Sequence, residues 1–303
     1  DKDLTFTPKY YNKENALFLN EYRQAFENGF LTLDTGYTQG YKEQTSSKTG
    51  GSRSHIFADL DFDLGKDKPF DSYLSFKVQQ TSNDTFFKVH NINTALVRSD
   101  NSNLENKITY NFAQDYTTLD ITASVYESLN VKTDKRYEYI LPNIIFGKTL
   151  FTDNFGTIDF SSNALYRNYD AKKETTFLTN DLVWIPKNIM TKKGFVNTIE
   201  GMVRNTNYEA KKTADYKTGG TVNELNGVVS FKSTLPMKKE GVGYSNFFSP
   251  NFMLRMAPGH MRDLTTESTT LNYANLYSMN RTSEIENGIS AVLGLDFITN
   301  TKN

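Results

Sequence analysis

Apolar and polar residues alternate with a period of two along most of this chain. The alternation is clearest at residues 56–64, 74–79, 119–126 and 289–297. Successive side chains of a β-strand point to opposite faces, so each segment predicts a strand with one apolar and one polar face. In the first segment, Asp59, Asp61 and Asp63 all fall on the polar face.

The same pattern predicts an all-β chain of fifteen strands without a convincing amphipathic helix. They are expected at residues 3–11, 16–26, 30–41, 54–64, 71–82, 106–113, 117–128, 136–147, 156–169, 175–185, 194–209, 222–236, 246–257, 270–279 and 288–298. Many have the length of about 9–11 residues that a tilted strand needs to cross a bilayer. Strands of soluble proteins average about 5–6 residues.

The predicted connections differ in length. Short polar turns are expected at 12–15 and 27–29, longer polar loops at 42–53 and 210–220, and the segment 83–105 is irregular. Short turns at one end of the strands and longer loops at the other are typical of outer-membrane β-barrels.

Composition narrows the class further. Only 37% of residues are hydrophobic, yet the chain has 22 Phe and 18 Tyr against a single Trp. No run of eighteen apolar residues exists, which excludes a helical membrane protein. Strands that are polar on one face and rich in aromatic residues fit a barrel with a water-filled lumen, although a large β-sandwich has the same pattern. In a barrel, the aromatic residues near strand ends would form interfacial girdles; they are Tyr10, Tyr11, Phe26, Phe30, Tyr37 and Tyr41.

Charge and cysteine content exclude several function classes. The net charge is −1 and no basic stripe is present, so no nucleic-acid partner is expected. The chain has no cysteine, which removes disulfides and thiolate metal sites.

Candidate catalytic and metal sites are weak. Asp59–Asp63 resembles the start of a calcium loop, but the positions for the invariant Gly and Glu hold Leu64 and Phe70. The three histidines, His55, His90 and His260, have no metal-ligand spacing and are expected at the surface or in a lumen. Without a nucleophile elbow or a Walker loop, we predict no enzyme, no cofactor and no metal.

Alternation instead predicts polar side chains that line a water-filled lumen. The lumen-facing candidates are Asp59, Asp61, Asp63, Lys77 and Asp120. A register shift of one residue would invert this assignment.

Pro8 lies inside the first predicted strand. Proline cannot donate a hydrogen bond to a β-ladder, so it is found at sheet edges, strand ends or weak seams. Pro8 therefore marks either a strand end or a seam that can open.

Three ordered groups of short motifs resemble the LptD family of lipopolysaccharide-assembly proteins. The first runs from Leu4 to Asp34 and contains TFTPKYY, NEYR and GFLTLD. The second contains FSP and LRMAPG between Phe248 and Gly259. The third contains NLYSMNR from Asn275 to Arg281, followed by Glu286, Asn287 and Gly288.

The resemblance implies that residues 1–303 are a partial domain of an outer-membrane β-barrel with about 26 strands. The family's periplasmic jelly-roll domain and first barrel strand would precede this segment, and the last strands would follow it. The family's inter-domain cysteines are absent. Pro8 falls on the family's proline next to the lateral seam.

The function implied by the resemblance is transport. A member of this family inserts lipopolysaccharide into the outer leaflet of the cell outer membrane through a lumen and a lateral seam. Its implied partners are lipopolysaccharide, a lipoprotein plug similar to LptE and a periplasmic bridge similar to LptA, which binds the jelly-roll domain. A generic porin or diffusion channel is the first alternative, a secreted β-sandwich binding module the second, and an enzyme the last.

Overall fold

The computed structural model describes residues 1–45, 48–153, 155–214, 216–258, 275–279 and 286–301, and these residues form an all-β fold. They contain sixteen strands and one short helix. The elements are β1 (Lys2–Lys9), β2 (Leu17–Ala25), β3 (Gly29–Thr45), β4 (Lys48–Asp63), β5 (Asp71–Thr81), α1 (Phe86–Val89), β6 (Asn103–Gln114), β7 (Thr117–Ser128), β8 (Tyr137–Asp153), β9 (Gly156–Tyr169), β10 (Lys173–Ile185), β11 (Ile189–Met190), β12 (Val196–Lys211), β13 (Val222–Thr234), β14 (Met237–Gly241), β15 (Tyr244–Ala257) and β16 (Gly288–Thr301).

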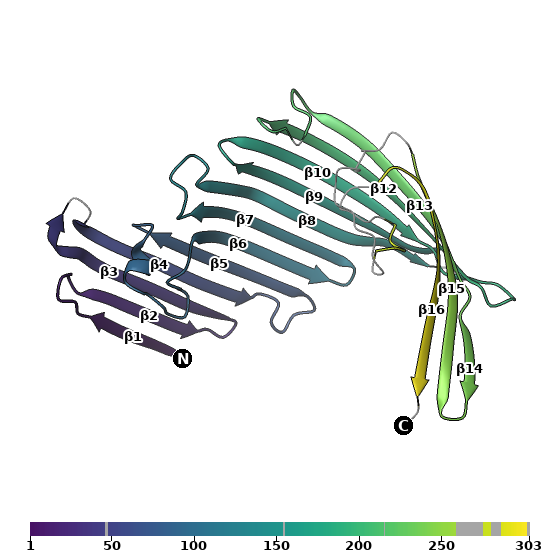
Figure 1. The fold of residues 1–303 in the computed structure, drawn as a ribbon, viewed down its shortest axis with the longest axis horizontal. Coiled ribbons are helices and arrows are strands. Elements are labelled where there is room, and N and C mark those ends of the chain that lie inside the picture. Colours follow the sequence, from purple (N-terminus) through teal and green to yellow (C-terminus); the bar gives the residue numbers. More distant parts are fainter. Residues whose placement is uncertain (46–47, 154, 215, 259–274, 280–285, 302–303) are drawn as a thin grey trace. The chain divides into compact units, whose positions relative to one another are not determined.

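The strands form a single antiparallel meander in which most chain neighbours are sheet neighbours, except that β10 is followed in the sheet by β12, and β13 by β15, which also pairs with β14. The order is β1 to β10 without interruption, then β12, β13 and β15, with β11 beside β12 and β16 beside β15 (Figure 1). Within the described residues β1 and β16 do not pair with each other, so the sheet is not closed into a barrel. The structure thus confirms the all-β class and the large antiparallel sheet of the predicted fold, and it shows no closed barrel within the described residues.

Fourteen of the fifteen predicted strands overlap observed ones. For the other, predicted at 270–279, residues 270–274 lie outside the described residues and 275–279 form turns. The prediction of a loop at 42–53 was wrong, because β3 and β4 continue to Thr45 and from Lys48 with register shifts after Thr38 and Gly40. Tyr37 and Tyr41 therefore lie inside β3 and not at its end. The elements α1, β11 and β14 were not predicted.

The chain divides into two compact units, and each is described by itself. Unit 1 comprises Asp1–Phe146, Asn163–Leu178 and Tyr208–Thr221. Unit 2 comprises Gly147–Ser162, Thr179–Asn207 and Val222–Asn303. No helix in the described part of the chain is long and apolar enough to span a membrane.

In unit 1, the strand register sorts side chains onto two chemically different faces. Leu60 lies between Leu31 and Phe76 in one cross-strand row, whereas Asp59 lies between Thr32 and Lys77 in the next. Because alternate residues point to opposite faces, the period-two pattern becomes one apolar and one polar face across β3–β7. On the apolar face, large side chains such as Leu4, Phe6, Ile56 and Ile108 remain exposed.

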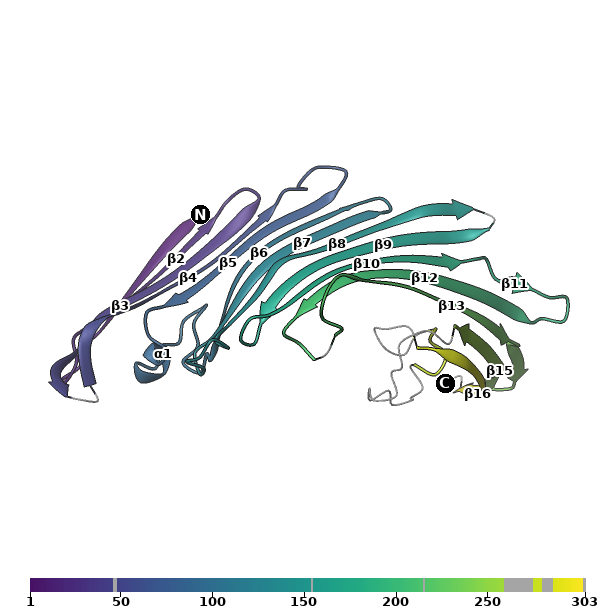
Figure 2. The same ribbon diagram turned by 90° about the horizontal axis from the view of Figure 1, so that it is seen from above.

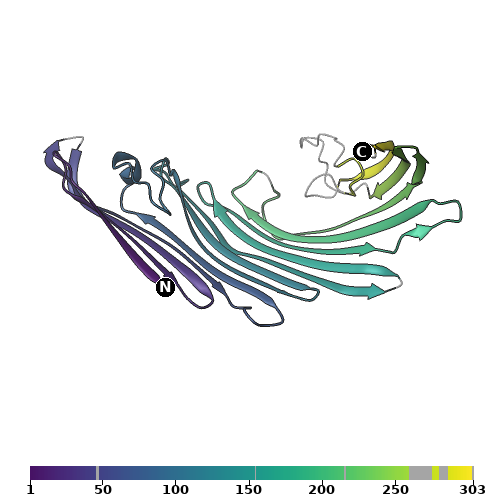
Figure 3. The ribbon, with the colours of Figure 1, turned by 90° about the horizontal axis from the view of Figure 1, so that it is seen from below.

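The core of unit 1 lies where the connection 82–102 between β5 and β6 folds back against the sheet. Figures 2 and 3 show α1, which this connection carries, standing off one face of the strands. Phe86 and Phe87 of α1 are fully buried against Leu17 and Phe57. Leu17 and Phe57 lie on the same side of the sheet as Asp34. This irregular segment is therefore a folded insertion, and we call residues 82–102 the insertion.

Unit 2 is organised around β15. On one side, β13 pairs with residues 251–256 and β14 with residues 244–248, so β13 and β14 occupy one line that is interrupted at Leu235 and Pro236. On the other side, β16 pairs with β15 along its whole length. The turn between β14 and β15 contains Gly243 with φ of 78°, a conformation in which glycine is favoured.

Candidate functional site

The polar face of β4–β7 brings together all five residues predicted to line a lumen. Asp59 pairs with Lys77, whereas Asp61 and Asp63 follow at alternate positions along β4. Asp120 of β7 lies opposite Asn111 of β6, which lies opposite Tyr73 of β5. Because Tyr73 in turn lies opposite Asp63, Asp120 and Asp63 belong to one cross-strand row. The register therefore places the five predicted residues on one face of the sheet.

An ion pair on this face joins β5 to β6. Lys77 Nζ lies 3.0 Å from Glu105 Oε2, and the hydroxyl of Tyr126 donates to Glu105 Oε1 at 3.1 Å. A polar cavity of about 220 Å³ between these strands is lined by Asp59, Asp61, Lys77, Glu105, Lys107 and Thr109, among others. Alternating carboxylates, amines and hydroxyls can bind the hydroxyl groups of a sugar through many hydrogen bonds.

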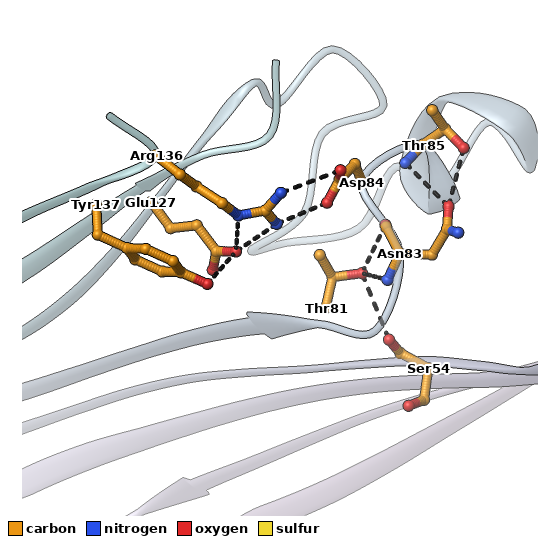
Figure 4. A network of polar contacts seen from close by, with 8 residues as sticks. All are labelled: Ser54, Thr81, Asn83, Asp84, Thr85, Glu127, Arg136 and Tyr137. Carbon is orange, nitrogen blue, oxygen red and sulfur yellow. Dashed lines mark hydrogen bonds and ion pairs between the residues drawn. The ribbon is translucent and has the colours of Figure 1, made fainter. Parts of the chain in front are cut away.

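The insertion is fastened to the sheet by Arg136, which precedes β8. Its guanidinium donates to both carboxylate oxygens of Asp84, with Nη2 2.6 Å from Oδ1 and Nη1 3.1 Å from Oδ2. It also donates to Glu127 of β7, to which the hydroxyl of Tyr137 donates at 3.1 Å. Figure 4 shows the guanidinium between the two carboxylates. The hydrogen bonds from Arg136 lower the pKa of Asp84. The contact of two guanidinium nitrogens with both oxygens of the Asp84 carboxylate is the planar bidentate geometry that arginine favours.

The base of the insertion is fixed by hydrogen bonds of backbone and hydroxyl groups near Asp84. The amide of Ser54 donates to the hydroxyl of Ser82 at 2.8 Å, and the amide of Ser82 donates to the carbonyl of Ser54 at 2.9 Å. Thr81 and Asn83 continue this network in Figure 4. At the other end of the insertion, the amide of Ala95 donates to Glu21 of β2 at 3.3 Å. The insertion therefore bridges β2, β4 and the β7–β8 connection.

A buried pair lies under the insertion. His55 Nε2 is 2.8 Å from Asp34 Oδ1, and both side chains are completely buried. The imidazole contacts the rings of Phe57, Phe86 and Phe87. It also occupies the space above its cross-strand neighbour Gly36, where an added Cβ would come within 2.4 Å of the ring. Glycine at this position is what allows His55 to turn toward Asp34.

His90 is buried and forms a second pair, with the partly exposed Glu14. Its Nδ1 lies 3.4 Å from Glu14 Oε2, and its ring packs against Phe86 and Tyr11. Burial lowers the pKa of His90, although the carboxylate of Glu14 acts in the opposite direction. The prediction of surface or lumen histidines was wrong for His55 and His90, because both are buried, His55 beneath the insertion and His90 within it against Tyr11; His260 lies outside the described residues.

Sequence reasoning missed these pairs because no local motif marks them. Asp34 shares one side of β3 with Thr32, Gly36 and Thr38, so the alternation does place it on the polar face. Its burial depends on the insertion, which lies about fifty residues further along the chain. The hydrogen bonds of Arg136 with Asp84 and Glu127 were not predictable from the sequence, in which only the irregular composition of residues 83–105 marks this region.

Pro8 lies in β1 opposite Phe18, and its side of the sheet also carries Phe6, whose ring stacks on that of Phe18 at 6.0 Å. Among the described residues β1 pairs only with β2, so Pro8 is in an edge strand. This placement follows from the missing amide donor of proline, which an edge tolerates.

In unit 2, residues 275–279 and Glu286 lie against the sheet. Arg255, almost fully buried, donates from Nε to the carbonyl of Met279 at 2.5 Å and from Nη2 to that of Glu286 at 2.6 Å. The hydroxyl of Tyr277 lies directly over Gly294 of β16. The second and third motif groups of the sequence are therefore in contact through Arg255.

No group of three or more His, Asp or Glu side chains within the described residues has an arrangement that could hold a metal ion. The chemistry that the described site offers is therefore hydrogen bonding and ion pairing on a polar face.

No model of a known protein family matches this chain, and no curated protein matches it. The resemblance to the LptD family consequently remains an expectation that rests on the short motifs alone.

Proposed function

We propose that this chain forms part of the wall of an outer-membrane β-barrel that inserts lipopolysaccharide into the outer leaflet. One observation carries the proposal: the register of β3–β7 separates an exposed apolar face from a polar face rich in charged side chains. In a soluble protein such an exposed apolar face is a liability, whereas lipid covers it in a barrel. All strands except β1, β11 and β14 have nine or more residues, which suits a membrane crossing.

The polar face would then line the lumen. Asp59, Asp61, Lys77 and Asp120 offer donors and acceptors to the sugars of lipopolysaccharide, and the insertion would narrow the passage. A lipoprotein plug similar to LptE and a periplasmic bridge similar to LptA are the partners that the sequence resemblance implies. A barrel of about 26 strands would need strands besides those of residues 1–303.

The lateral seam would lie along β1. Opening a seam in lipid costs several kcal/mol for each backbone group left unsatisfied. Pro8 lacks an amide donor, so fewer hydrogen bonds are lost when its strand separates. This edge position supports Pro8 as a seam residue.

A porin-like diffusion channel is the second candidate. The inward-folded insertion favours it, because a loop held over a polar face restricts the size of a diffusing solute. The two functions differ in their cargo and can be separated in cells.

The first experiment depletes the intact protein in its own cell and follows newly made lipopolysaccharide. We expect lipopolysaccharide to stop reaching the surface and to accumulate at the inner membrane. Unchanged surface lipopolysaccharide with reduced uptake of small solutes would instead identify a porin-like channel.

Cysteine labelling tests the assignment of the two faces. Asp61→Cys and Leu60→Cys provide a matched pair of neighbours on opposite faces of β4, in a chain without native cysteine. A water-soluble maleimide should label position 61 and not position 60 in native membranes. The reverse result would show that the polar face does not line the lumen.

A further inference from the structure

The polar cavity of unit 1 combines hydroxyls, amines and carboxylates in its lining. It lies over β4, β5 and β6, and its volume of about 220 Å³ suffices for about seven water molecules or one sugar ring. Two neighbouring cross-strand rows of side chains form its floor. The first row is Asp61, Ser75 and Thr109, and the second is Asp59, Lys77 and Lys107. The cavity therefore offers hydrogen-bond donors and acceptors side by side.

Two of the three carboxylates that line the cavity are open to a ligand. Lys77 is opposite Asp59 in the ladder, yet its Nζ lies 3.0 Å from Glu105 Oε2. The other oxygen of Glu105 lies 4.0 Å from Nζ of Lys107, so both amines share this carboxylate. Within the described residues, Asp59 and Asp61 form no ion pair and no side-chain hydrogen bond. Their oxygens can therefore accept hydrogen bonds from the hydroxyl groups of a ligand.

The two hydroxyl groups of the cavity are available in the same way. Ser75 and Thr109 are cross-strand neighbours, and both residues are half-buried. In the part of the chain that the structure describes, neither hydroxyl has a hydrogen-bond partner. Because a hydroxyl both donates and accepts, the two side chains can exchange hydrogen bonds with adjacent hydroxyl groups of one sugar ring.

The charges of the lining disfavour an anionic sugar. Three carboxylates and two amines leave the cavity with a net charge of −1; they are Asp59, Asp61, Glu105, Lys77 and Lys107. Both amines already lie near Glu105, whereas the open groups at Asp59 and Asp61 are negative. A phosphate or carboxylate group of a sugar would meet like charge there, and an uncharged sugar would not.

We infer that this cavity binds one uncharged sugar ring and selects it over phosphorylated and carboxylated sugars. The inference rests on the proposed function, because the polar face must meet a saccharide. It goes further, because it names the class of sugar unit that the face retains. That unit is an unphosphorylated hexose whose hydroxyl groups bind Asp59, Asp61, Ser75 and Thr109.

Binding of two probes to the purified full-length protein tests the inference. The probes are methyl α-glucopyranoside, which is uncharged, and glucose 6-phosphate. Titrations followed by saturation-transfer NMR give both dissociation constants, in an amine-oxide detergent because maltoside detergents carry sugars themselves. We expect the phosphorylated sugar to bind about tenfold more weakly, since the carboxylates repel its phosphate.

A charge variant tests the origin of this preference. Asp59→Asn with Asp61→Asn preserves the shape of the cavity and removes two negative charges, so its net charge changes from −1 to +1. We expect glucose 6-phosphate to bind this variant at least as tightly as the glucoside. The control is Asp67→Asn with Asp115→Asn, two exposed acids in turns outside the cavity whose positive φ asparagine tolerates well. The control should keep the tenfold preference.

A hydroxyl variant tests the hydrogen bonds separately from the charges. Thr109→Val removes one lining hydroxyl with little change in volume, so we expect severalfold weaker binding of both probes at an unchanged ratio. Thr118→Val is its control, because Thr118 lies opposite Ala113 and does not line the cavity. It should leave both dissociation constants as they are in the parent.

Equal dissociation constants of the two probes in the parent, or an unchanged ratio in Asp59→Asn with Asp61→Asn, would overturn the selection by charge. Binding that all cavity variants leave unchanged would place the sugar elsewhere and overturn the assignment to this cavity. Absence of binding by either probe would overturn the sugar site itself. The transport function would then still be decided separately by the depletion experiment, which follows lipopolysaccharide and not a single sugar.

Discussion

The Nε2 atom of His55 lies 2.8 Å from Oδ1 of Asp34, and solvent reaches neither side chain. The pair joins β3 to β4 directly beneath α1, where Phe86 and Phe87 exclude water. A hydrogen bond buried in this way contributes little in net terms while intact, yet removing one partner leaves a polar atom without water.

Replacement of the carboxylate should therefore destabilise the fold. Asp34→Ala is expected to lower the free energy of unfolding by about 1–3 kcal/mol, because the imidazole nitrogen loses its buried partner. Urea titration followed by far-ultraviolet circular dichroism in detergent measures the change. Glu240→Ala, which removes only an exposed ion pair with Lys238, is the control and should shift the midpoint little. Equal midpoints for the two variants would contradict a structural role of the buried pair.

Loss of the hydrogen bonds that Arg136 donates to Asp84 and Glu127 should release the insertion while the strands remain paired. Arg136→Gln removes the contacts to Asp84 and Glu127, so we expect amide exchange at residues 86–92 to accelerate about thirtyfold, which corresponds to about 2 kcal/mol. Mass spectrometry of deuterated peptides provides the measurement. Arg98→Gln, which breaks an exposed pair with Asp100 in the same insertion, is the matched control. Equal acceleration in both variants would show that the insertion is held by its apolar core alone.

Acid should loosen the insertion through His90. Burial holds the pKa of His90 below its usual value of about 6.5, so the folded state binds this proton less readily than the unfolded state. The resulting penalty is absent above about pH 6.5 and grows as the pH falls below that value. A fluorophore on Lys88→Cys should report increased mobility between pH 7 and pH 5.

The contribution of Asp84 follows a separate pH window. Arg136 holds the pKa of this carboxyl below its usual value, so its stabilisation is complete above about pH 4 and is lost at lower pH. His90→Phe should therefore abolish the change between pH 7 and pH 5 and leave the more acidic one. A profile that is identical with and without His90 would exclude this residue as the origin.

Most strands follow from alternation, because each is long enough to show several periods. The segments that alternation cannot reveal are short, such as β11 and β14, or depend on distant partners. The insertion is such a case: Phe86 and Phe87 form one helical turn only against Leu17 and Phe57, which precede them by many residues. The five polar candidates were placed on one face by period alone, whereas Asp34 and His55 required knowledge of what covers them.

Pro8 provides a test of the seam in the assembled protein. Pro8→Ala restores an amide donor to β1, so one more ladder hydrogen bond can form and must break when the strand separates in lipid. We expect slower arrival of pulse-labelled lipopolysaccharide at the cell surface. Pro236→Ala is the control, because its proline lies in the connection between β13 and β14. An unchanged rate in Pro8→Ala cells under demanding growth conditions would remove Pro8 from the release step.

The interruption at Pro236 has a mechanical consequence for unit 2. Leu235 still donates to the carbonyl of Pro250 at 3.1 Å, but paired residues resume only at Met237 opposite Phe248. On the opposite edge, the ladder between β15 and β16 runs without a break from Tyr244 to Ala257. The only break in pairing on this side of β15 is therefore two residues long, and the ladder with β16 splints β15 across it as far as the hairpin end at Tyr244.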